Sequence, residues 1–209
     1  MMQNFRNRAA LCLAALALLA SQAAHALPGY HVSVDTRSFS GQALLDFTFL
    51  ANAGATPASA TLDNFSGAFG ATFDASPGIA GALPASAVLG NQDGGDYLTR
   101  FVQLGGWFSF DIRFDGAFAT TENIDASLFA ATLYNADLTG YIGNAGSLVE
   151  FALLPQAGGT TGGISVTTGG LASVSEISPV PEPSALLMML GGLGLFGWHR
   201  RRQLQASKP

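Results

Sequence analysis

Residues 108–115 read FSFDIRFD, and this stretch decides the fold class of the chain. Phenylalanine and isoleucine alternate strictly with serine, aspartate and arginine, so that every second side chain is apolar. Successive side chains of a β-strand point to opposite faces of its sheet. The period of two therefore predicts a strand with one buried face and one solvated face.

The same alternation recurs on both sides of this strand. It predicts further strands at residues 30–36, 44–50, 127–136, 147–155, 163–168 and 171–178, separated by turn sequences such as NQDGGD and GGTTGG. Residues 51–89 are rich in Ala, Gly and Ser, and DNFSGAFGATFD within them fits either two short strands or an ordered loop. Many short strands with few helix signals predict an all-β domain, an antiparallel β-sandwich or a jelly roll.

The central part of the chain, residues 27–178, is strongly acidic. It carries 13 carboxylates against three arginines and no lysine, a net charge of about −10. Such a surface repels nucleic acid and anionic lipid, which excludes both as partners of this part of the chain. It is compatible with divalent cations and with neutral polysaccharide.

Residues 1–26 have the pattern of a secretory signal peptide. Two arginines and no acid precede an apolar run over residues 9–20, and Ala24 and Ala26 supply the small residues of an A-x-A cleavage site. The run is shorter than the roughly 20 residues that a membrane span needs. We therefore expect export through the Sec translocon and cleavage by signal peptidase after Ala26.

Residues 180–202 read VPEPSALLMMLGGLGLFGWHRRR. The uncharged run over residues 184–198 would span about 22 Å as a helix, less than the hydrocarbon core of about 30 Å. It predicts a short transmembrane helix, with Trp198 at the lipid headgroups. The basic end at residues 199–202 would hold the following tail, 203–209, in the cytoplasm, because positive charge favours that side. Its arginines are Arg200, Arg201 and Arg202.

The order of Pro181, Glu182 and Pro183, a short apolar helix and an arginine cluster closely resembles the PEP-CTERM sorting signal of Gram-negative bacteria. The resemblance implies that an exosortase, a membrane transpeptidase-like protease, recognises the tail and cleaves near residues 181–183. It further implies an exported protein that the C-terminal helix anchors in the inner membrane until processing. Afterwards such proteins belong to the cell surface or the exopolysaccharide matrix.

These patterns divide the chain into four segments. The signal peptide occupies residues 1–26, the β-sandwich ectodomain residues 27–178, the sorting signal residues 179–202 and the cytoplasmic tail residues 203–209.

Few residues of the ectodomain point to catalysis. His31 is its only histidine, and no G-x-S-x-G motif accompanies it. Asp111 and Asp115 share one strand face, but four residues separate them by about 13 Å, and Arg113 stands between them. Cys12, the only cysteine, leaves with the signal peptide, so no thiol remains. We expect no catalytic residue and no enzyme.

One turn has the composition of a calcium site. Asn91, Asp93 and Asp96 in NQDGGD place oxygen ligands on a flexible turn, although the EF-hand spacing and its closing glutamate are missing. The alternative is an ordinary turn, so Ca²⁺ is the one cofactor that the sequence suggests.

Aromatic side chains can stack on sugar rings if they are exposed. The candidates are Tyr97, Trp107, Tyr134 and Tyr141, with burial in the core as the alternative for each. Trp107 follows two glycines, and Tyr97 is nearby in sequence, so these two form a candidate platform.

The sequence therefore predicts an exported, non-catalytic surface or matrix protein that contributes adhesion or scaffolding in an exopolysaccharide layer. The alternative is a carbohydrate- or calcium-binding module of that matrix. A glycan-active hydrolase, the third class, would require two acids that converge in a cleft.

Overall fold

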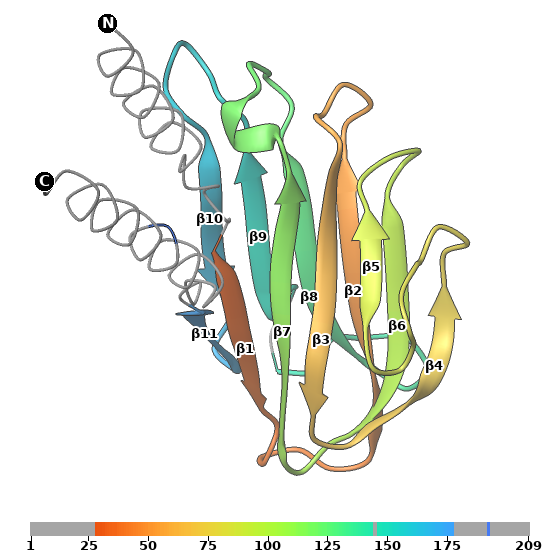
Figure 1. Cartoon of the computed structure of the whole chain (residues 1–209). Coiled ribbons are helices and arrows are strands. Elements are labelled where there is room, and N and C mark those ends of the chain that lie inside the picture. The colour runs from red at the N-terminus through yellow and green to blue at the C-terminus, as the bar shows by residue number, and fades with distance from the viewer. Residues whose placement is uncertain (1–27, 144–145, 178–191, 193–209) are drawn as a thin grey trace, which may run out of the picture.

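Two antiparallel sheets pack face to face in the computed structural model, which describes residues 28–143, 146–177 and 192 (Figure 1). This arrangement confirms the predicted all-β sandwich. The five-stranded sheet has the order β11-β1-β7-β3-β5, and the six-stranded sheet has the order β10-β9-β8-β2-β6-β4.

The strand bounds are as follows. The five-stranded sheet contains β1 (Gly29–Asp35), β3 (Ala58–Ser66), β5 (Ala87–Gly90), β7 (Trp107–Gly116) and β11 (Ala172–Ile177). The six-stranded sheet contains β2 (Gln42–Ala51), β4 (Phe69–Ala75), β6 (Asp96–Gln103), β8 (Ser127–Asn135), β9 (Val149–Leu154) and β10 (Gly163–Thr168). A short 3₁₀ turn, η1 (Phe118–Thr120), follows β7.

The predicted signal peptide and, apart from Gly192, the predicted C-terminal helix lie outside the described residues. Among the residues that the structure describes, no helix has the length and apolar character needed to cross a membrane.

The alternation in residues 108–115 produces β7 at the centre of the five-stranded sheet. Its apolar side chains are buried and face the other sheet. The ring of Phe110 lies 5.0 Å from that of Phe47, and the ring of Phe114 lies 5.4 Å from that of Phe151. Each fully buried phenylalanine contributes about 1.5–3 kcal/mol to folding, so this aromatic layer is the main apolar contact between the sheets.

The region of uncertain pattern contains regular structure. Residues 51–89 hold β3, β4 and the start of β5, so DNFSGAFGATFD belongs to two strands. Their turn contains Gly67 at φ 102°, where a Cβ atom would lie 2.5 Å from the carbonyl oxygen of Trp107. Only glycine fits such a position without strain.

The sequence pattern does not predict β6, because a charged residue occupies its inward face. Arg100 lies between the core residues Leu98 and Val102 and is only 3% exposed. Its Nη2 donates to the carbonyl oxygen of Gly70 at 3.0 Å, and its guanidinium lies 5.0 Å from the ring centroid of Phe65. Burial lowers the pKa of Arg100.

The first and last strands of the sandwich lie side by side at one edge (Figure 1). β1 pairs with β7 on one side and with β11 on the other, and Gly29 stands opposite Ile177. Ala26, the last residue before the predicted signal cleavage, precedes Gly29 by three positions. The predicted sorting signal starts two positions after Ile177. Both segments therefore join the sandwich at the same corner.

Candidate functional site

The outer face of the six-stranded sheet carries a row of apolar side chains that crosses four strands. Leu44 of β2 lies opposite Phe101 of β6 and Tyr134 of β8. Phe73 of β4 packs on Phe101 with ring centroids 5.4 Å apart. Tyr141, from the segment after β8, packs on Tyr134 at 5.1 Å. We call these five residues the aromatic strip.

Strand alternation places the strip outside the core. Leu45 of β2 and Val102 of β6 point into the core, so their neighbours Leu44 and Phe101 point outward. Leu44 is fully buried although it does not belong to the core cluster, which indicates that its neighbours in the strip cover it. The two ends of the strip are open, because Phe73 is 48% exposed and Tyr141 is 53% exposed.

A row of hydroxyl and carboxyl groups lies beside the strip, two residues further along β2, β6 and β8. Asp46 stands opposite Thr99 and Thr132, and Thr99 Oγ1 donates to Asp46 Oδ1 at 2.6 Å. Asp74 also stands opposite Thr99, and its Oδ2 accepts a hydrogen bond of 3.1 Å from Tyr97 Oη. We call Asp46, Asp74, Thr99 and Thr132 the polar row.

The polar row places negative charge in a partly dehydrated setting. Burial raises the pKa of Asp46, and the hydrogen bond from Thr99 offsets this only in part. The hydrogen bond to Asp74 raises the pKa of the Tyr97 hydroxyl, with smaller contributions from burial and from the negative charges of Asp74 and Asp46.

Within the described ranges, no arginine side chain lies on this outer face. Arg37 lies over the ring of Trp107 at 4.9 Å, next to the five-stranded sheet. Arg113 forms an ion pair with Asp63 on the outer face of that same sheet. Arg100 points into the core. The aromatic strip is therefore bordered by carboxylates and hydroxyls, with no cation among them.

The structure does not bring together Tyr97 and Trp107, the two residues of the predicted platform. Tyr97 lies near the start of β6 and Trp107 starts β7, so the two belong to different sheets. The six residue steps from Tyr97 to Gln103 span about 20 Å of strand, which places the two rings at opposite ends of the sandwich. The other two candidates, Tyr134 and Tyr141, do come together in the strip.

The side chain of Asn91, the first residue of the predicted calcium turn, is buried and connects this turn to the starts of β3 and β8. It is only 3% exposed. Its Oδ1 accepts from the backbone N–H of Ala58 at 2.9 Å, and its Nδ2 donates to Ser127 Oγ at 2.7 Å. The side-chain oxygen of Asn91 thus has a protein donor.

Asp93 and Asp96, the other two residues of the predicted calcium turn, have side chains in different surroundings. The carboxylate of Asp96 accepts from Ser76 Oγ at 2.6 Å and from the Gly90 N–H at 2.7 Å. Asp93 is exposed and lines, with Asn91, a pocket of about 230 Å³. The part of the chain that the structure describes contains no group of three or more His, Cys, Asp or Glu residues arranged to hold a metal ion.

His31 and Asp111 form a pair on the outer face of the five-stranded sheet. His31 Nδ1 lies 2.6 Å from Asp111 Oδ1, and Asn64 Nδ2 donates to Asp111 Oδ2 at 2.8 Å. Burial disfavours the charged form of Asp111, but the hydrogen bonds from Asn64 and His31, together with the charges of His31 and Arg113, outweigh it, so that the pKa is lowered. Sequence reasoning missed this pair because its members are 80 positions apart.

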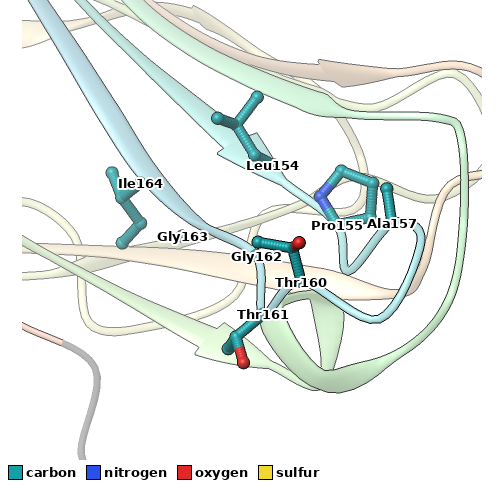
Figure 2. A pocket seen from close by; sticks show the side chains of 8 residues that line it. All are labelled: Leu154, Pro155, Ala157, Thr160, Thr161, Gly162, Gly163 and Ile164. Atoms are coloured by element: carbon teal, nitrogen blue, oxygen red, sulfur yellow. The ribbon is translucent and has the colours of Figure 1, made fainter.

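A shallow pocket of about 350 Å³ lies at the turn between β9 and β10 (Figure 2). Leu154, Pro155 and Ile164 supply its apolar walls, and two threonine side chains supply its hydroxyls. The pocket offers apolar contact and no titratable side chain.

Comparison with known proteins identifies one segment of the chain. A family model described as the PEP-CTERM protein-sorting motif matches residues 179–203. No curated protein and no solved structure matches the chain.

The match contains Pro181, Glu182 and Pro183 as well as Trp198 and the three following arginines, all of which lie outside the described residues. It begins two positions after the end of β11. Cleavage of the signal peptide after Ala26, at the site marked by Ala24 and Ala26, stays a prediction. The motif indicates export, anchoring in the membrane before processing, and exosortase as the processing partner. The chain thus carries the sorting motif of an exported, exosortase-processed protein, and this motif directly follows its β-sandwich.

Proposed function

We propose that the protein is a non-catalytic component of the cell surface or exopolysaccharide matrix, where its β-sandwich contributes adhesion or scaffolding. The short connection between the sandwich and the sorting motif carries this proposal. Only residue 178 lies between the end of β11 at Ile177 and the start of the matched motif. Sorting would therefore deliver the sandwich itself to its destination.

The position of that connection also favours a role in contact with extended material. Both β1 and β11 lie at one edge of the five-stranded sheet, so the predicted attachment leaves the sandwich at an edge. The outer faces of the two sheets remain available as broad surfaces. Broad surfaces suit a polymer or a neighbouring cell-surface component better than a small substrate, which needs a concave site.

The test compares three strains of the native host, which produce the full chain, a chain without residues 179–203 or no protein. We expect the full chain in the surface or matrix fraction, and the shortened chain exported into the medium. The cohesion of the matrix and the adhesion of the cells should fall in the other two strains. A chain without residues 204–209 is the matched control, because it is shortened outside the motif, and it should behave like the full chain.

Two results would contradict the proposal. The first is unchanged cohesion and adhesion in the strain without the protein. The second is retention of the full chain inside the cell.

A carbohydrate-binding module is the second candidate, and the aromatic strip favours it. A calcium-dependent form would bind in the presence of calcium and lose binding in chelator, through the turn that contains Asp93. Persistence of binding in chelator would leave the strip as the binding surface.

A further inference from the structure

We propose that the outer face of the six-stranded sheet is a binding platform for an extended, uncharged polysaccharide chain. The aromatic strip stacks on the apolar faces of the sugar rings, and the polar row accepts and donates hydrogen bonds to their hydroxyl groups. This inference rests on the proposed function, because it names the matrix ligand of a protein delivered to the surface.

The dimensions of the strip match a chain of sugar rings. Four of its members lie on β4, β6, β2 and β8 and cover three strand spacings, or about 14 Å. Tyr141 extends the strip beyond β8, beside Tyr134. Phe101 and Tyr134 stand on the two sides of Leu44. They are thus two spacings apart, about 9.6 Å, which is close to the length of two sugar rings in an extended β-linked chain.

The rings also have an arrangement suited to stacking. Tyr134 and Tyr141 are inclined to each other by only 32°, so together they offer a surface wider than a single ring. Phe73 stands at 87° to Phe101 and borders the strip at the β4 edge of the sheet. A platform that is wide at one end and bordered at the other can hold a linear chain in one line.

The polar row supplies the second half of sugar recognition. It runs parallel to the strip at a distance of two residues, about 6.7 Å along the strands. Sugar rings combine apolar C–H faces with hydroxyls at their edges, so a ring stacked on the strip directs hydroxyls to the row. Asp46 is half-buried, so part of the water around its carboxylate has already been removed. A sugar hydroxyl that donates a hydrogen bond to the Asp46 carboxylate therefore displaces less water than it would displace from a fully exposed carboxylate.

The charge of the face selects against acidic polysaccharides. Asp46 and Asp74 lie in the polar row, and Glu150 of β9 lies on the same face two residues beyond it along the neighbouring strand. The arginines of the described residues all lie elsewhere. A polymer with carboxylate or sulfate groups would meet like charge without a compensating cation.

The experiment measures affinity by titration calorimetry with the processed protein recovered from the surface of its host. The probes are the neutral and the anionic fractions of the host's extracellular polysaccharide, separated by anion exchange. The test variant combines Phe73→Ala with Tyr141→Ala, because both rings are about half exposed and their removal leaves the core intact. Trp107→Ala is the matched control, since Trp107 is 50% exposed on the other sheet.

We expect the wild-type chain to bind the neutral fraction. The double variant should bind it about tenfold more weakly or worse, because each lost ring removes stacking energy. The control should keep the wild-type affinity within about twofold. A Tyr141→Phe variant keeps the ring and should bind like the wild type, while circular dichroism checks that each variant is folded.

Four results would overturn the platform. Three of them come from calorimetry: absence of binding to the neutral fraction, unchanged affinity of the double variant, and tighter binding to the anionic fraction. The fourth comes from sedimentation: the chain associates with a second copy that occupies the strip. Failure of the platform differs from failure of the proposed function. If only the platform fails, a host strain that produces the double variant keeps its matrix cohesion. If the proposed function fails, a host strain that lacks the protein keeps its matrix cohesion as well.

Discussion

Two aspartates on opposite outer faces of the sandwich respond differently to burial. Asp111 receives hydrogen bonds from Asn64 and His31, which together with the charges of His31 and Arg113 outweigh its dehydration and lower its pKa. Asp46 has the hydroxyl of Thr99 as its donor, so burial prevails and raises its pKa. The number and charge of the donors thus decide whether a partly buried carboxylate stabilises the fold.

This contrast predicts opposite effects of two matched substitutions. At neutral pH, Asp111→Asn should lower the free energy of unfolding by about 1–2 kcal/mol, because a charged acceptor of two hydrogen bonds is lost. Asp46→Asn should raise the free energy of unfolding, because it removes a charge that burial disfavours. Urea unfolding of both variants and the wild type measures the two differences.

The pH dependence provides the control. Folding lowers the pKa of Asp111, so its stabilising contribution is complete above the ordinary value of 3.8 and is lost as the pH falls below it through the folded-state pKa. The pKa of Asp46 is raised, so its destabilising contribution disappears as the pH falls through the folded-state pKa to below 3.8. Both variants should therefore approach the wild type in acid. Equal stability of Asp111→Asn and the wild type at neutral pH would contradict the assignment.

At the scale of strands, the sequence predicts those elements whose inward side chains are large and apolar. The phenylalanines of β7 and β2 indicate their buried faces directly. β3 gives a weaker signal because Ala58 and Ala60 occupy two of its inward positions, and β6 gives none because Arg100 lies inward. Alternation assigns faces within a strand, so it fails where the inward residue is small or charged.

The candidate site shows a second limit of sequence reasoning. Leu44, Phe101 and Tyr134 lie in the outward phase of their strands, where a solvated face predicts polar residues. This departure from the pattern was a readable signal for each residue alone. Their alignment in one row depends on strand order and register, which bring β6, β2 and β8 together. Local sequence patterns do not contain strand order and register. For the same reason, closeness in sequence did not bring the predicted platform residues Tyr97 and Trp107 together in the fold.

The edge strand β11 provides a test of the sandwich at this scale. Val174 lies opposite Val32 and packs against the core, whereas Ser173 on the same strand is exposed. Val174→Asp should lower the free energy of unfolding by about 1–3 kcal/mol, because a carboxylate would lie against apolar side chains. Ser173→Asp is the matched control and should change it by less than about 0.5 kcal/mol. Equal effects in urea unfolding would show that β11 does not pack as described.

At the scale of the whole molecule, the sorting motif and the sandwich are close neighbours. Four positions separate Ile177 from Pro181, which limits their distance to about 14 Å even in a fully extended chain. A protease that cleaves within the motif must therefore approach the folded corner formed by β1 and β11. The described strands end before the motif, so the cut leaves the sandwich whole.

Processing at this point predicts the mass of the protein recovered from the host surface. The intact mass should correspond to a chain that begins after Ala26 and ends near residues 181–183. Recovery of surface-exposed protein that still contains Arg200, Arg201 and Arg202 would contradict processing within the motif. Membrane-fraction protein from cells without exosortase is the control and should retain these arginines.

The pairing of the first strand with the last also sets an order of events in time. Gly29 and Ile177 are 148 positions apart, so the edge of the five-stranded sheet closes only after nearly the whole sandwich has been synthesised and exported. Contacts of such long range form slowly, because the chain entropy of a large loop must be overcome first. The sorting motif leaves the translocation machinery directly after β11. Completion of folding and arrival of the motif thus nearly coincide, and the rate of strand closure decides whether exosortase meets a folded or an open substrate.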